Sequence, residues 1–186
     1  MAAALRVLVE GGQQALTVRR VAAEAGVSTI GVYTWFGGKD GLIDAIWIEG
    51  FQSFAAAIRS AHRDAPPVEQ LVAQARAYRA WALAHPVHYR VLFLGAVPSH
   101  IPGHDAIKAG AVAFELLQEA VTHAVDQRAI VSTDVDATAM FLWGLVHGMV
   151  SLQLVNDRPV QLATSDQLDD RAFDTAIEAV VRGMTP

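Results

Sequence analysis

Three basic side chains within one short stretch, residues 17–39, could bind a polyanion. Arg19 and Arg20 are adjacent, Lys39 closes the stretch, and only one acidic residue lies between them. Such cations bind phosphate oxygens, and an arginine fork can also donate two hydrogen bonds to a guanine edge. The hydroxyl of Tyr33 is a further phosphate donor. This stretch is therefore our candidate for contact with a nucleic acid.

Two short helices joined at a glycine must position these groups. Thr17 can cap the first helix through its hydroxyl, and Gly26 ends it because glycine adopts the left-handed backbone without steric cost. Ser28 caps the second helix, which runs to about Phe36. The residues expected to face inward are Ile30, Val32 and Phe36, with Val27 filling the angle between the helices. Those expected outward or along the rim are Thr29, Gly31, Tyr33 and Trp35. A second helix of this kind fits the major groove of DNA, which is the layout of a helix-turn-helix.

The segment resembles the DNA-binding domain of tetracycline-repressor-type (TetR family) regulators over roughly residues 2–50. The matching residues are Leu16, Thr17, Val21, Ala22, Ala25, Gly26, Val27, Ser28, Val32, Tyr33, Phe36, Lys39 and Leu42. The resemblance implies a three-helix head on a helical body that binds a ligand and forms a dimer. It also implies a ligand-responsive repressor, whereas spacing alone predicts a helix-turn-helix.

Within this head, we expect nine residues to form the DNA-binding site. They are Thr17, Arg19, Arg20, Ser28, Thr29, Gly31, Tyr33, Trp35 and Lys39. Arg19 is the one whose family counterpart more often reaches bases, and Lys39 is the best phosphate clamp. Gly31 would allow close approach to a base pair. Trp35 departs from the family, which usually carries histidine there. The alternative for the arginines is a pair of solvated cations, and for Tyr33 a ring that only packs the turn.

A second signature, Trp143 to His147 and Gly148, resembles the Trp-His-Gly-type C-terminal domain of one subset of the family, and residues 85–93 fit the same subset. A largely apolar ligand pocket is plausible there; its candidate residues are Trp81, Tyr89, Phe93, Phe114, Leu117, Met140, Trp143 and His147. The alternative is that these side chains simply fill the core. Small residues at helical spacing predict a dimer interface, whose candidates are Gly144, Gly148, Ser151, Phe173, Ile177, Val180 and Val181. The alternative is ordinary packing within one chain.

Composition limits the other classes of function. The net charge is −5, but residues 1–63 hold six basic and five acidic side chains, so the acidity lies in the rest of the chain. Because charges are screened beyond about 8–10 Å, an acidic body does not prevent a faintly basic head from binding DNA. The chain has no cysteine, and its histidines form no tight cluster with carboxylates. We therefore expect no metal site and no cofactor, and no set of residues predicts an enzyme.

The chain reads as all-α, with helices over about 2–10, 17–25, 28–36, 39–65, 68–84, 87–94, 105–126, 132–156 and 165–182. We expect residues 1–50 to form the DNA-binding domain and residues 51–186 the ligand-binding and dimerisation domain, with Pro66 and Pro67 as the hinge. The apolar run 139–155 is short for a membrane span, so we expect a buried bundle helix there. No secretory signal is visible, which favours the cytoplasm.

The sequence thus predicts a homodimeric, cytoplasmic transcriptional regulator that binds a palindromic duplex operator and responds to a small molecule, without contact to a membrane. A repressor is the leading form, and an activator of the same family is an alternative. A protein-interaction adaptor with a vestigial head is a further alternative, which Trp35 and the lack of a basic arm before the first helix keep open.

Overall fold

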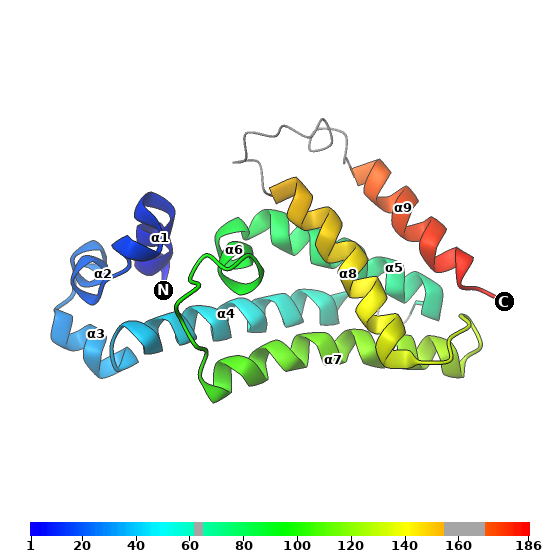
Figure 1. Cartoon of the computed structure of the whole chain (residues 1–186), viewed down its shortest axis with the longest axis horizontal. Helices are drawn as coiled ribbons and strands as arrows, with labels where there is room; N and C mark the ends of the chain where they lie inside the picture. The colour runs from blue at the N-terminus through cyan, green and yellow to red at the C-terminus, as the bar shows by residue number, and fades with distance from the viewer. Residues whose placement is uncertain (62–64, 155–169) are drawn as a thin grey trace. The chain divides into compact units, whose positions relative to one another are not determined.

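A computed structural model describes residues 1–61, 65–154 and 170–186, and these ranges contain helices but no strand (Figure 1). The predicted all-α class is confirmed. The helices are α1 (Ala2–Ala15), α2 (Val18–Ala25), α3 (Thr29–Phe36), α4 (Lys39–Ser60), α5 (Pro67–Ala84), α6 (Pro86–Phe93), α7 (His104–Asp126), α8 (Val135–Leu154) and α9 (Asp170–Gly183).

Two predicted helix ends differ from the structure. The sequence predicts a first helix that stops at residue 10, but α1 continues to Ala15 with a kink, because Gly12 alone leaves the helical region (φ 62°). It predicts a fourth helix that reaches Ala65, but α4 ends at Ser60. The expected end of the eighth helix near Asn156 and the expected start of the ninth near Ser165 lie outside the described residues.

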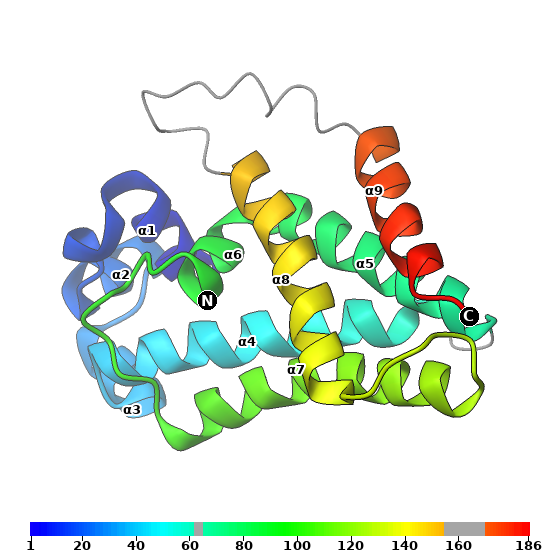
Figure 2. The same cartoon turned by 45° about the vertical axis from the view of Figure 1, so that its right-hand side comes forward.

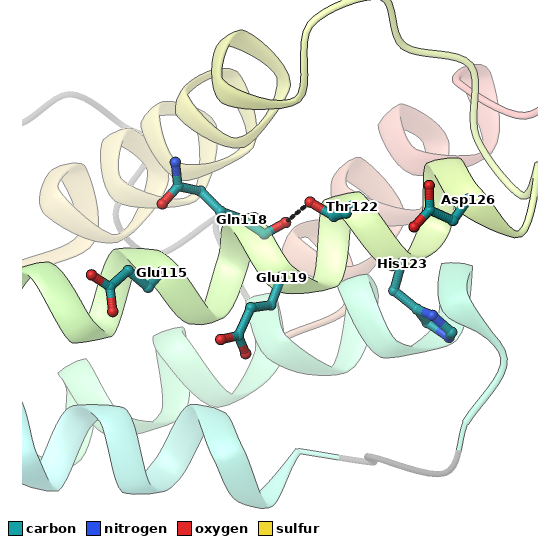
Figure 3. A pocket seen from close by; sticks show the side chains of 6 residues that line it. All are labelled: Glu115, Gln118, Glu119, Thr122, His123 and Asp126. Atoms are coloured by element: carbon teal, nitrogen blue, oxygen red, sulfur yellow. Dashed lines mark hydrogen bonds between the residues drawn. The ribbon is translucent and has the colours of Figure 1, made fainter.

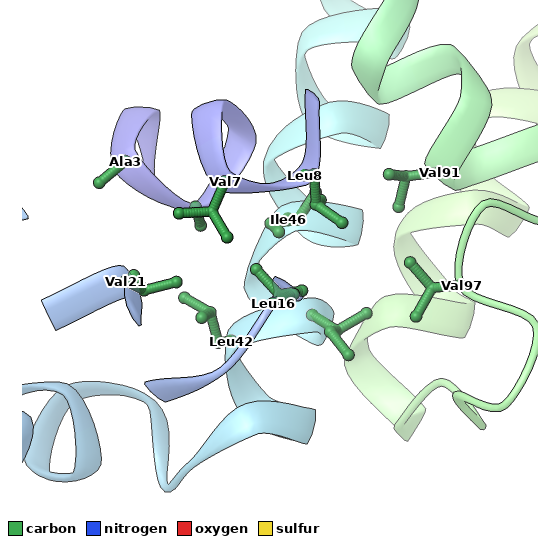
Figure 4. Close-up of a cluster of buried hydrophobic side chains, with 11 residues drawn as sticks. Ala3, Val7, Leu8, Leu16, Val21, Leu42, Ile46, Val91 and Val97 are labelled. Atoms are coloured by element: carbon green, nitrogen blue, oxygen red, sulfur yellow. The ribbon is translucent and has the colours of Figure 1, made fainter. Parts of the chain in front are cut away.

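Residues 1–53 and 85–111 form one compact unit. Its core is a cluster of aliphatic side chains from α1, from α4 and from the segment around α6 (Figure 4). Leu16 and Ile46 are fully buried there, and Val91 and Val97 complete the cluster from the 85–111 segment. The segment 85–111 thus packs on the N-terminal helices, although the sequence assigned it to the second domain. The domain boundary at residue 50 stays a prediction.

Residues 54–84 and 112–186 form the second compact unit, in which α5 contacts both α8 and α9 (Figure 2). The side chain of Arg79 on α5 is 10% exposed and pairs with Asp170. It also donates to Gln153 (3.1 Å) and lies over the ring of Phe173, 5.2 Å from its centroid. One buried arginine therefore connects α5 to both α8 and α9.

The helices α4 and α8 are long and apolar enough to cross a membrane by length and composition alone. This is weak evidence, because core helices of soluble proteins pass the same test. In α8 only 22% of the most apolar window is buried. The expectation of a buried bundle helix over 139–155 is thus only partly met among the described residues, since Met140, Phe141 and Leu152 are exposed. Val155 lies outside the described residues.

Candidate functional site

Two hydroxyl caps and a left-handed glycine set the angle between α2 and α3. Thr17 Oγ1 accepts a hydrogen bond from the backbone N–H of Arg20 (3.2 Å), and Ser28 Oγ accepts one from that of Gly31 (3.0 Å). Gly26 ends α2 with φ 67°. These side chains are therefore committed to the turn, as the sequence predicted; any contact that Thr17 or Ser28 makes with DNA remains a prediction.

The helix α3 has one buried face and one exposed face. Val32 is 2% exposed and packs with Val18 and Ala22 of α2, with Phe36 partly buried beside it. This small cluster attaches α3 to α2. The side chains of Ile30, Tyr33 and Trp35 on the other sides of α3 are exposed.

The prediction that Ile30 points inward is wrong. Its side chain is 76% exposed, because a rotation of about 100° per residue places it almost opposite Val32 and Phe36. Val27, expected to fill the angle between the helices, is 37% exposed. The helical period would have predicted an outward position for Ile30, but the prediction relied on its hydrophobicity alone and assigned it to the core.

The predicted DNA contacts on α3 are accessible. Tyr33 is 58% and Trp35 65% exposed, Thr29 is exposed, and Gly31 is half-buried. The hydroxyl of Thr34 donates to the carbonyl of Ile30 (2.9 Å) and so stabilises the helix. All nine predicted DNA-binding residues lie in the first compact unit, between Thr17 and the first residue of α4.

The three cations of the site differ in their surroundings. Arg20 pairs with Glu10 of α1 (3.1 Å). Lys39 donates to the carbonyl of Gln13 at 3.5 Å, the long end of hydrogen-bond distance. Arg19 is exposed, and no carboxylate pairs with it within the described part of the chain. Arg19 therefore presents the least compensated charge.

The eight predicted pocket residues divide between the two compact units. Tyr89 and Phe93 belong to the first, where Tyr89 is fully buried and its ring meets that of Phe93 at a tilted angle (5.1 Å between centroids). The other six belong to the second: Trp81, Phe114, Leu117, Met140, Trp143 and His147. Trp81 is buried, whereas Met140 is 53% exposed on α8.

Within the second unit, His147 joins the aromatic residues of the predicted pocket. Its ring stacks on Trp143 (4.9 Å), which meets Phe114 edge-on (6.4 Å). A hydrogen bond of 2.9 Å joins His147 Nδ1 to Tyr78 Oη of α5. Burial lowers the pKa of His147, because desolvation disfavours the imidazolium. This cluster presents a neutral histidine near pH 7, and sequence reasoning missed Tyr78 as its partner.

The second unit also has a shallow groove along α7, which is polar (Figure 3). The residues that line it are Glu115, Gln118, Glu119, Thr122, His123 and Asp126. None of them belongs to the predicted apolar pocket. Among the described residues, no three histidine, aspartate or glutamate side chains are placed to hold a metal ion.

The predicted dimer residues fall into two groups. Phe173, Ile177 and Val181 of α9 are at most 3% exposed, because they pack inside their own chain on the face of α9 turned to α5. Their burial is thus explained within one chain, and their place in a dimer interface stays a prediction. On α8, by contrast, a Cβ added to Gly144 or Gly148 would meet no atom within 4 Å. Ser151 and Val180 are half-buried.

A contact that the sequence did not predict joins α4 to the loop before α7. Asp44 Oδ1 lies 2.8 Å from His100 Nε2, and it accepts a hydrogen bond from the backbone N–H of Gly103 (3.1 Å). The side chain of His100 is 2% exposed. This histidine therefore fixes a loop on α4 inside the first unit.

Two family models match the chain. "Bacterial regulatory proteins, tetR family" matches residues 1–46, which include α2 and α3, and "Tetracyclin repressor-like, C-terminal domain" matches residues 71–180. The second match alone covers more than half of the chain.

The chain is similar to a curated regulator over about half of its length and to solved structures over nearly all of it. The HTH-type transcriptional regulator Rv1816 of Mycobacterium tuberculosis is 26% identical over 98 residues, which are 51% of this chain and 42% of that protein. The chain thus matches less than half the length of its curated relatives. A solved protein of unknown function from Rhodococcus sp. RHA1 is 26% identical with a TM-score of 0.79, covering 100% of this chain and 93% of that one. A tetR-family regulatory protein from Rhodococcus RHA1 is 22% identical with a TM-score of 0.74, covering 99% and 94%, and shows the same fold.

Proposed function

Because the chain belongs to the tetR family of bacterial regulatory proteins, we propose that it is a DNA-binding transcriptional regulator. The observation that carries this proposal is the exposed face of α3, with Ile30, Tyr33 and Trp35 open to solvent and the cations Arg19 and Lys39 beside it. Phosphate contacts by the cations would fix the register, and α3 would enter the major groove.

The proposed assembly is a homodimer that binds an inverted repeat. The exposed face of α8 supports a second copy as its partner, because Met140, Phe141 and Leu152 are each more than 50% exposed beside the uncovered Gly144 and Gly148. An exposed apolar face marks an interaction site, and small residues let a second helix approach closely. Such an interface would be two-fold symmetric and would present two copies of α3 about 34–36 Å apart.

The proposed regulation is release of DNA by a small-molecule effector bound in the body, in the cytoplasm. The half-buried group of Phe114, Trp143 and His147 supports an aromatic, mainly apolar site with a polar anchor. Helix α4 contributes residues to both compact units, so a tilt of α4 would change the spacing of the heads. An effector that binds more tightly to the conformation with the non-binding spacing lowers the affinity for DNA. The size of this effect is limited by the difference between the effector's affinities for the two conformations.

Selection of bound sequences from random duplex DNA, with the full-length protein, tests this function. We expect an enriched inverted repeat, and sedimentation of the complex should give two chains per duplex. Recovery of no enriched sequence would instead favour the adaptor alternative. An activator would bind the same kind of site, and a transcription assay with the recovered operator separates it from a repressor.

Lys39→Ala tests the docking geometry on that operator. The variant should bind more weakly to all sequences, and the slope of log K against log salt should fall by about 0.9 for each phosphate that the lysine no longer neutralises. The operator preference should not change, because phosphate contacts carry no direct sequence information. Unchanged affinity and slope would show that Lys39 does not contact the backbone of DNA.

A further inference from the structure

The helix α3 carries no charged side chain and no amide side chain: its sequence is TIGVYTWF. Guanine and adenine are read in the major groove by bidentate hydrogen bonds from arginine, lysine, asparagine or glutamine, and cytosine by carboxylates. None of these residue types is present on α3. If α3 is the helix that enters the groove, it has only hydroxyl groups for single hydrogen bonds to bases, so apolar contacts must supply much of its discrimination.

The outward face of α3 is apolar at its centre. At about 100° per residue, Ile30 and Thr34 lie opposite the buried Val32 and Phe36. Ile30 is 76% exposed. Thr34 donates its hydroxyl proton to the carbonyl of Ile30 (2.9 Å), so it has no proton left to donate to a base. The centre of the face therefore offers a branched aliphatic side chain and a threonine engaged with its own helix.

Trp35 extends this surface along one edge. Two of its ring carbons lie 3.8 and 3.9 Å from the position that a Cβ on Gly31 would take, so the ring lies beside the bare backbone of Gly31. Its side chain is 65% exposed. An exposed apolar surface of this kind, on a helix with no charge, fits a partner with apolar groups at matching places.

We propose that α3 recognises its operator through the C5-methyl groups of thymine, with Ile30 as the principal contact and Trp35 as a second. The thymine methyl is the apolar group that a base pair presents in the major groove of unmodified DNA, and apolar side chains contact it. Arg19, on α2, remains the side chain able to read a guanine. This inference rests on the proposed DNA-binding function.

Replacing thymine by uracil tests the inference, because it removes the methyl group and leaves the hydrogen-bonding edge unchanged. The probe is a synthetic duplex of the selected operator, with single thymines of each half-site replaced symmetrically, titrated with the full-length protein at fixed salt. Burial of one methyl is worth about a four-fold change in affinity. The symmetric replacement of a contacted thymine should therefore weaken binding about fifteen-fold.

Ile30→Ala supplies the matching protein change, and Ile107→Ala is its control. Ile107 is an isoleucine of α7, 60% exposed and outside α3. At one position of each half-site, the ratio of the affinity for the thymine duplex to that for the uracil duplex should fall toward one in Ile30→Ala. This variant should bind the uracil duplex with an affinity within about two-fold of that of the unsubstituted protein. Ile107→Ala should keep the full ratio. Because Ile30 is exposed, its substitution leaves the core of the head intact.

Three results would overturn the inference without touching the proposed function. They are a selected operator without thymine in its half-sites, a ratio near one at every thymine, or a ratio that Ile30→Ala does not change. The last two would mean that the apolar face of α3 does not lie against the bases. Absence of any sequence-selective binding by the unsubstituted protein would instead refute the proposed function itself.

Discussion

Gly31→Ala should stabilise the protein and weaken its binding to DNA. Glycine inside a helix costs about 0.8–1.0 kcal/mol relative to alanine. A Cβ at residue 31 would lie 3.5 Å from Ser28 Oγ and 3.8 Å from the nearest ring carbon of Trp35, which are ordinary contact distances. The free energy of unfolding should therefore rise by about 0.5–1 kcal/mol, with a melting temperature higher by about 1–4 °C.

The same methyl group would stand on the half-exposed side of α3, beside the face proposed to enter the groove. Forcing an extra methyl into a close contact costs about 1–3 kcal/mol, so operator affinity should fall by about ten-fold or more for each half-site. Calorimetry or urea unfolding measures the first effect, and fluorescence anisotropy with a labelled operator measures the second. A stabilised variant with full affinity would refute close approach at Gly31. A destabilised variant would refute the local geometry of α3.

Three further predictions follow from single contacts. Arg19→Ala should weaken operator binding more than Arg20→Ala, because Glu10 already compensates Arg20 (3.1 Å); anisotropy at matched salt compares them, and the reverse order would contradict the assignment. Gly50→Ala should lower the free energy of unfolding by up to about 2 kcal/mol, since a Cβ there would lie 3.0 Å from a methyl of Leu92 and the overpacking cost of about 1–3 kcal/mol is only partly offset by the roughly 1 kcal/mol that alanine gains inside a helix; a rise of about 1 kcal/mol in urea unfolding would show that α6 yields without cost. Burial lowers the pKa of His147, so the unfolded chain takes up the proton first and stability should fall as the pH falls through about 6.5. His147→Gln should make this decline shallower, and an unchanged pH profile of unfolding would contradict that.

The helix-turn-helix could be predicted from sequence because its signals are local. Thr17, Gly26 and Ser28 each fix the backbone within a few residues of themselves, and the structure shows the two caps and the left-handed glycine as predicted. The backbone conformation at Gly12 could not be predicted from local signals in the same way. One glycine permits both a helix end and a kink, and the packing of Leu16 in the core is a tertiary effect.

The parts of the body that could not be predicted depend on contacts between distant segments. The pairing of His100 with Asp44 joins residues 56 apart, and that of Arg79 with Asp170 joins residues 91 apart. Hydrophobicity identified Phe173 and Ile177 as apolar positions, but it cannot say whether their partner is the same chain or a second copy. The structure places them inside the chain.

The position of Ile30, in contrast, could have been predicted from a local rule. The prediction followed its residue type instead. Helical rotation places it outward, and its hydrophobic character suggested the core. A residue that breaks the usual match between hydrophobicity and burial is a candidate for function. The DNA-binding, pocket and dimer residues themselves remain predictions.

Side-chain protection of α3 by operator DNA tests the central claim most directly. Hydroxyl-radical footprinting followed by mass spectrometry measures the oxidation rates of Tyr33 and Trp35, which are 58% and 65% exposed in the free chain. We predict that saturating operator slows both rates severalfold while that of Val131, 62% exposed between α7 and α8, is unchanged. Equal rates for Tyr33 and Trp35 with and without bound operator would show that the outer face of α3 stays in solvent and would contradict the account.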